Sequence, residues 1–191
     1  MPGLGGRNTT PYRDTVADPF TIRPLAPEDD LHALTRLLHR AYAPLAAAGM
    51  NYLASHQSTE VTRERACAEG VTCLIAVDAA GAPVGTVSIA GPPEPGDAPN
   101  GSPAWYARPE VAVFGQYAVD PAWQGRGVGS GLLDASIVAA RGRGFRELAC
   151  DTSEHAEALI ALYTRRGFRP VGHADWDVTN YRSVVLSLAL A

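Results

Sequence analysis

The glycine-rich segment at residues 117–130, YAVDPAWQGRGVGS, constrains the fold more than any other part of the chain. The apolar, β-prone residues 111–116 before it predict a strand. Asp120 and Pro121 end that strand, because proline has no N–H to contribute to a sheet. Apolar residues then recur at helical spacing through residues 131–140. The segment is therefore predicted to be a tight turn that leads from a strand into a helix.

The glycines of this turn predict a backbone cradle for an anion. Gly125, Gly127 and Gly129 leave the N–H groups of a first helical turn open to close approach, and the helix dipole favours negative charge there. A P-loop needs a lysine after its last glycine, and the chain contains no lysine. The dinucleotide pattern G-x-G-x-x-G needs glycine at the positions of Ser130 or Leu132. The chain therefore matches neither of these two common phosphate-binding loops.

The remaining pattern, QGRGVG at residues 124–129, resembles the Q/R-x-x-G-x-G/A signature of the GNAT superfamily of acyl-CoA-dependent N-acyltransferases. A second stretch, ALIALYTRRGF at residues 158–168, resembles a helix of that family that ends L-Y-x-x-x-G-F before a strand. The two signatures stand in the family's order, and the resemblance covers roughly residues 20–190. One departure is Ala156, which occupies a position where the family often has asparagine. Thr152, Ser153 or His155 would have to hold the cofactor arm or cap the helix instead.

The resemblance implies an α+β fold. Its centre would be a mixed, mostly antiparallel β-sheet of about six to seven strands, flanked by about four helices, with a splayed parallel strand pair at the cofactor site. The residue patterns predict strands at 20–25, 72–77, 83–89, 110–119, 146–151, 168–172 and 183–190. They predict helices from about 28 to Pro44, from 58 to 69, from the glycine turn to about 143, and up to 166. Residues 1–19 are expected to be a flexible N-terminal arm, and residues 20–191 a single GNAT-type N-acetyltransferase domain.

Several local features are predicted as well. Gly115 is a plausible site for a β-bulge that splays its strand. Asp151, with Glu154 three residues later, is expected to form a capping box for the last helix. Residues 91–109 read as a long proline-rich loop, in which Trp105 and Tyr106 are either buried anchors or substrate contacts.

The resemblance implies a chemistry: transfer of an acetyl group from acetyl-CoA to a primary amine of a small molecule or peptide, by direct attack in a ternary complex. The residues that match the family's cofactor site are Tyr117, Ala118, Val119, Gln124, Gly125, Arg126, Gly127, Val128, Gly129, Ser130 and Tyr163. Tyr163 matches the family's usual proton donor, and Glu110 is a candidate general base. The structural alternatives are a buried, packed tyrosine and an exposed charge at a strand end. No metal is expected.

Two further residues are expected to be structural. Cys150 lies in an apolar strand and is expected to be a buried thiol and not a nucleophile. Asp151 is expected to be a helix cap more than a base.

Composition narrows the function classes. A net charge of −4 argues against a general nucleic-acid binder. No apolar run reaches the roughly 20 residues of a membrane span, and the start lacks the features of a signal peptide. Three cysteines without C-x-x-C spacing suggest neither disulfides nor zinc, so a cytoplasmic protein is expected.

The expected partner is an amine acceptor, with no nucleic acid and no membrane, and a homodimer is one assembly that such a domain can form. A non-catalytic acyl-CoA-binding module is the main alternative function. An enzyme acting on nucleotide phosphates is a third, which the missing lysine disfavours.

Overall fold

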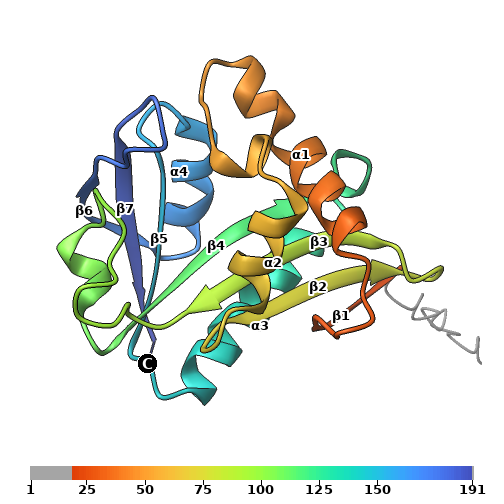
Figure 1. The fold of residues 1–191 in the computed structure, drawn as a ribbon, viewed down its shortest axis with the longest axis horizontal. Coiled ribbons are helices and arrows are strands. Elements are labelled where there is room, and N and C mark those ends of the chain that lie inside the picture. Colours follow the sequence, from red (N-terminus) through yellow and green to blue (C-terminus); the bar gives the residue numbers. More distant parts are fainter. Residues whose placement is uncertain (1–18, 191) are drawn as a thin grey trace, which may run out of the picture.

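The computed structural model describes residues 19–190, so the expected arm at residues 1–19 lies outside the described part except for Pro19. Seven strands form one sheet in the order β1-β2-β3-β4-β5-β7-β6 (Figure 1). Neighbouring strands are antiparallel except for β4 and β5, which are parallel. The predicted mixed, mostly antiparallel sheet is therefore confirmed.

The element bounds follow the sequence patterns closely. The strands are β1 Phe20–Pro24, β2 Thr72–Asp78, β3 Pro83–Ala90, β4 Val111–Val119, β5 Glu147–Ser153, β6 Arg169–Ala174 and β7 Ser183–Ala189. The α-helices are α1 Leu31–Ala47, α2 Thr59–Cys67, α3 Val128–Gly142 and α4 Glu157–Arg165. Short 3-10 helices are η1 Leu53–Ser55, η2 Ala104–Ala107 and η3 Pro121–Trp123.

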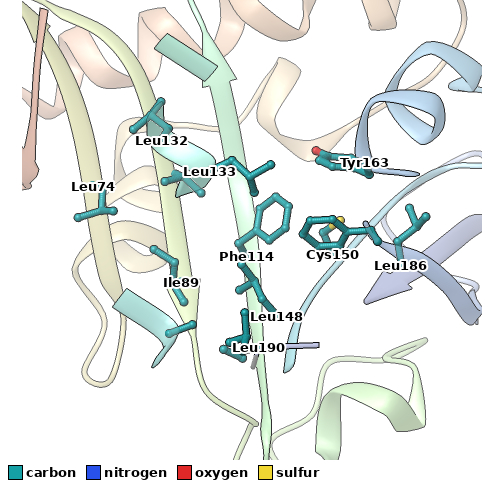
Figure 2. Packing of buried hydrophobic residues seen from close by; sticks show 14 of the residues in the cluster. Leu74, Ile89, Phe114, Leu132, Leu133, Leu148, Cys150, Tyr163, Leu186 and Leu190 are labelled. Carbon is teal, nitrogen blue, oxygen red and sulfur yellow. The ribbon is translucent and has the colours of Figure 1, made fainter. Parts of the chain in front are cut away.

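The sheet is covered on both faces, because side chains alternate along each strand. In β2, Leu74 packs into a core with α3 and α4, whereas Ile75 packs into a second core under α1 and α2. Figure 1 shows α1 and α2 on one side of β2 and β3 and α3 on the other. In the larger core, Phe114 of β4 meets Tyr163 of α4 edge-on at 5.7 Å (Figure 2).

Helix α3 sits very close to strand β3, because a glycine lies between them. A Cβ atom added to Gly85 would lie 2.8 Å from both Val128 and Leu132 in the first turns of α3. Real Cβ contacts are longer than that, so only glycine allows this separation. Gly85 thereby sets how closely the N-terminus of α3 approaches the sheet.

Strand β4 contains a β-bulge between Gly115 and Ala118, both of which pair with residues of β3. Ser88 pairs with Gly115 and Thr86 pairs with Ala118, so β4 has one extra residue in this interval. Gln116 carries the irregular conformation, with φ +47°. The sequence prediction that Gly115 is the bulge is therefore one residue off. Glycine would have suited a positive φ, but a glutamine adopts it here, which indicates that surrounding contacts hold it.

The parallel pair splays as predicted. β4 and β5 pair from Val111 and Glu147 to Val113 and Ala149, and the ladder then ends. Both strands continue, β4 to Val119 and β5 to Ser153. The carboxyl-terminal half of β4 therefore has a strand partner only on its β3 side.

Two helix boundaries differ from the sequence predictions. Pro44 lies inside α1, which continues to Ala47, because proline near the last turn removes only one backbone bond. The end of that helix is closed by the N–H of Ala48, which donates to the Pro44 and Leu45 carbonyls at 3.1 Å.

The prediction of a capping box at Asp151 and Glu154 is also wrong. β5 continues through Ser153, which pairs with Ser183 of β7, and α4 begins only after Ala156. The N-terminus of α4 has no side-chain cap, and the Asp151 carboxylate is free for other contacts.

The 91–109 loop is anchored by its aromatic residues. Tyr106 is 5% exposed and packs with Val111, Ala149 and Val185, and Trp105 packs against the same cluster. Of the two roles considered, the structure supports anchoring.

Candidate active site

A pocket of about 680 Å³ lies where β4 leaves β5. The carboxyl-terminal half of β4, the start of α3 and one face of α4 line it, and α1 closes one side. All the predicted cofactor residues except Arg126 and Val128 line this pocket. The structure therefore brings together two sequence signatures that are far apart in the chain.

The glycine turn presents free backbone donors to the pocket. Gly127 caps α3 with φ +87°, a conformation that other residues rarely adopt, and it contributes no side chain. The first backbone bond of the helix runs from the Gly131 N–H to the Gly127 carbonyl at 2.9 Å. The N–H groups of residues 128–130 precede it, so they have no acceptor within the helix. A phosphate group is the kind of ligand that such a helix start binds.

The turn and the open strand are in direct contact. A Cβ atom added to Gly129 would lie 2.9 Å from the Tyr117 hydroxyl. Burial raises the pKa of Tyr117 to about 12, so this phenol stays protonated at neutral pH. The glycine at 129 therefore lets the Tyr117 ring lie against the first turn of α3.

Two predicted residues lie outside the pocket lining. The Arg126 guanidinium stacks 5.0 Å from the centre of the Trp123 ring, and Val128 is 1% exposed in the core. Val128 could contribute to binding only through its backbone. Sequence reasoning missed Trp123 and Arg166, which do line the pocket. Arg166 lies within the second signature stretch, and its ion pair with Asp134 of α3 connects α4 to α3.

The open edge of β4 is positioned by helix α1. The Tyr42 hydroxyl donates to the backbone carbonyl of Tyr117 at 3.2 Å. Ala118 and Val119 pair with β3 on one side and have no strand partner on the other. An extended acyl chain could form strand-like hydrogen bonds at this edge.

Tyr163 is both a packed residue and a pocket residue. Its ring is 5% exposed and packs against Phe114, Tyr117 and Phe168. Its hydroxyl has no hydrogen-bond partner in the described part of the chain. The hydroxyl oxygen is not sealed from solvent, and Tyr163 lines the pocket. Figure 2 shows the side chain projecting from α4 toward β4. Burial raises the pKa of Tyr163, so it carries a proton that it can donate.

Glu110 is not brought to this site. It precedes the first residue of β4, whereas the pocket adjoins residues 117–119 at the other end of a nine-residue strand, roughly 25 Å away. Its carboxylate accepts a hydrogen bond from Arg108 Nε at 2.9 Å, and Arg108 lowers its pKa. The structure therefore gives this carboxylate an ion-pair role at the far end of the strand.

Cys150 is enclosed in the core near the splay. Its side chain is 2% exposed and packs in the same cluster as Phe114 and Tyr163 (Figure 2). Burial raises the pKa of this thiol well above its usual value. A nucleophilic cysteine needs the opposite shift.

Asp151 holds a position at the splay that sequence reasoning did not foresee. Its two carboxylate oxygens accept hydrogen bonds from the Tyr106 hydroxyl and from Trp176 Nε1, both at 2.9 Å. The Tyr52 hydroxyl lies 2.8 Å from Thr152 Oγ1 and accepts from the Ser153 N–H at 3.0 Å. The segment between α1 and α2 therefore reaches across to the carboxyl end of β5.

Tyr181 completes this aromatic group. Its ring lies 4.9 Å from that of Tyr52, which lies 5.4 Å from that of Tyr42. Tyr52 and Tyr181 come from segments without periodicity, so no sequence signal placed them together.

Within residues 19–190, no group of three or more histidine, cysteine or acidic side chains is arranged to hold a metal ion. In the same range, no helix is both long and apolar enough to cross a membrane.

Comparisons with known proteins agree with this geometry. The model of the Acetyltransferase (GNAT) family matches residues 31–168. No curated protein matches the chain.

Solved structures show the same fold. A GCN5-related N-acetyltransferase from Kribbella flavida has a TM-score of 0.66 at 21% identity, covering 90% of this chain and 98% of its own. The ribosomal-protein-S18-alanine N-acetyltransferase from Escherichia coli has a TM-score of 0.65 at 19% identity, covering 90% and 94%. An N-acetyltransferase from Staphylococcus aureus has a TM-score of 0.64 at 20% identity, covering 90% and 99%. The family match over most of the chain and the shared fold establish that this chain belongs to the GNAT acetyltransferase family.

Proposed function

We propose that the chain is an N-acetyltransferase that transfers an acetyl group from acetyl-CoA to a primary amine by direct attack in a ternary complex. One observation carries the proposal: a single pocket joins the free amides of the glycine turn, the open edge of β4 and the hydroxyl of Tyr163. Coenzyme A offers a pyrophosphate, an extended amide-containing arm and a thioester in that order.

The residues present fit such a co-substrate. A side chain at Gly127 or Gly129 would obstruct the approach of a phosphate to the amides, and the chain has glycine at both positions. The open edge at residues 117–119 can pair with the amides of the arm. The thioester would supply an activated acetyl group.

Three tasks then remain for the protein. A backbone N–H near Val119 can polarise the thioester carbonyl. Tyr163 can donate its proton to the departing thiolate, because the hydroxyl is protonated and has no other partner. Asp151 replaces Glu110 as the candidate for attracting the acceptor ammonium and taking its proton, because it lies at the splay and Glu110 does not.

A non-catalytic acyl-CoA-binding module would need the amides and the strand edge but not a free phenol. The unpartnered Tyr163 hydroxyl therefore favours the enzyme. The name of the Escherichia coli neighbour specifies an alanine of a ribosomal protein as its acceptor. That acceptor is not assigned to this chain.

The test is release of free thiol from acetyl-CoA by purified protein with amines, amino acids, polyamines, aminoglycosides and peptides. We expect thiol release that depends on one class of amine, with the acetylated amine detected by mass spectrometry. Thermal stabilisation by acetyl-CoA without turnover of any amine would support the binding module instead.

A further inference from the structure

A chain of hydrogen bonds beneath α2 ends in donors that lack an acceptor. Arg65 of α2 donates to Gln57 Oε1 at 2.7 Å. Gln57 Nε2 donates to Gln116 Oε1 at 3.2 Å and to Thr62 Oγ1 at 2.8 Å. Gln116 is the bulge residue of β4, so this chain connects helix α2 to the open strand.

The direction of every bond in this chain is fixed by its first member. A guanidinium has donors only, so the Gln57 atom that faces Arg65 must be oxygen. The amide nitrogen of Gln57 then faces Gln116, which must present its own oxygen. The Gln116 amide nitrogen is left over, and it is sealed from solvent with no hydrogen-bond partner. A buried unpaired donor costs about 1–3 kcal/mol, so an acceptor supplied from outside the chain would relieve it.

Arg65 also lacks a charged partner. Its side chain is partly buried, and desolvation lowers its pKa. In the described part of the chain, no carboxylate lies within the 4 Å of an ion pair. The negative field of Asp151 reaches Arg65 and raises its pKa, but the two do not pair. Arg65 and Asp151 therefore carry opposite charges, and neither has an ionic partner in the part of the chain that the structure describes.

We propose that the acceptor is an amine that also carries an anionic group, such as an amino acid, and that Arg65 and the Gln116 amide bind this anionic group while Asp151 faces the ammonium. This inference rests on the proposed acetyltransferase function. A small molecule with both charges complements Arg65 and Asp151 at once, whereas a simple amine leaves the guanidinium unpaired. The rings of Tyr42, Tyr52 and Tyr181 lie in series, and Tyr52 contacts Thr152, the residue after Asp151.

The experiment compares matched acceptors. A panel of amino acids is assayed with acetyl-CoA by thiol release, each beside its decarboxylated amine and its carboxamide. A charge-assisted hydrogen bond predicts kcat/KM about 10- to 100-fold higher for the acid-bearing member. Arg65→Gln should remove this preference by raising the KM of the amino acid, with little effect on the KM of acetyl-CoA or on the acid-free amine.

Two variants sharpen the test. Arg63→Gln removes the same charge from the exposed face of α2 and should keep the preference. Gln116→Glu retains the oxygen that accepts from Gln57 and replaces the free donor by a carboxylate, so it should weaken binding of the amino acid as Arg65→Gln does.

The outcomes separate this inference from the proposed function. Equal or better turnover of acid-free amines by the wild type, or an equal loss for both acceptors in Arg65→Gln, would overturn the acid-bearing acceptor and leave the acetyltransferase standing. Absence of turnover with every amine would overturn the acetyltransferase itself, and this inference with it.

Discussion

The hydroxyl of Tyr42 donates to the backbone carbonyl of Tyr117 at 3.2 Å, which ties helix α1 to the strand edge that has no partner strand. This contact occupies one polar group of the open edge and leaves the rest for an incoming chain. It also holds β4 at the residue directly after Gln116, which has the positive φ of the bulge.

Replacing Gly129 by valine should abolish cofactor binding. Its branched side chain would collide with Tyr117, since even a Cβ atom would lie 2.9 Å from the hydroxyl. Acetyl-CoA at 100 times its Kd should raise the Tm of the wild type by roughly 5–10 °C, and Gly129→Val should show no shift. The control is Gly142→Val at the exposed end of α3, where a Cβ atom meets nothing within 4 Å. Equal shifts in both variants would place the cofactor elsewhere.

Tyr163→Phe should lower kcat by roughly 10- to 1000-fold and leave the Kd of acetyl-CoA nearly unchanged. The phenyl ring keeps the contacts with Phe114 and Phe168, so the free energy of unfolding should change little. Stopped-flow thiol detection across pH 6 to 9 measures the effect. If kcat is unaltered throughout, Tyr163 serves packing alone.

Asp151→Asn and Glu110→Gln form a matched pair of charge removals. Asp151→Asn should reduce kcat/KM for the acceptor by about 100-fold, because the acceptor ammonium loses both its attraction and its base. Glu110→Gln should leave kcat/KM within a factor of about two, since that carboxylate is at the opposite end of β4. Initial rates with varied acceptor decide between them, and the reverse pattern would restore the original assignment of Glu110.

Cys150→Ala should keep most of the activity. The thiol is 2% exposed and its pKa is raised by burial, so it is a poor nucleophile at neutral pH. Initial-rate plots should intersect, and mass spectrometry of enzyme with acetyl-CoA alone should find no acetylated protein. Parallel lines together with an acetyl group on Cys150 would establish a covalent route instead.

The stability of the protein should fall steeply in alkali. Burial raises the pKa values of Tyr42, Tyr106 and Tyr163 above that of an unfolded tyrosine, about 10. Above that pH the unfolded chain loses protons that the native state retains, so the free energy of unfolding decreases as pH rises. Each buried tyrosine contributes up to about 1.4 kcal/mol per pH unit. Urea unfolding between pH 9 and 11 measures the slope, and Tyr42→Phe should make it shallower; an unchanged slope would mean that Tyr42 ionises freely in the native state.

The parts of the fold that follow local rules could be predicted from sequence. The glycine turn, the hairpin and the parallel crossover follow from proline, glycine and apolar periodicity, and they are confirmed. The predicted helix end at Pro44 was wrong because a proline near the last turn removes only one backbone bond. The predicted Asp151 cap was wrong because pairing with β7 extends β5 past that residue.

The candidate site also has one part that could be predicted from local sequence and one part that could not. The turn of the proposed cofactor site is one continuous segment, which the signature marks. The proposed acceptor site takes Gln57, Arg65, Asp151 and Tyr181 from four segments. The β-bulge and the splay were both predicted, but no local sequence signal indicates which side chains they bring near one another.

The glycine at position 85 gives the cofactor site an outer boundary that its lining does not reveal. Gly85 is not itself part of the pocket lining, but it pairs with Val119 at the strand edge and fixes the separation between the first turn of α3 and the sheet. Even a single methyl group there would push the amide donors away from the strand edge, so a ligand that spans both would fit neither. A genetic screen for loss of cofactor binding is therefore expected to recover substitutions at Gly85, a position outside the pocket lining.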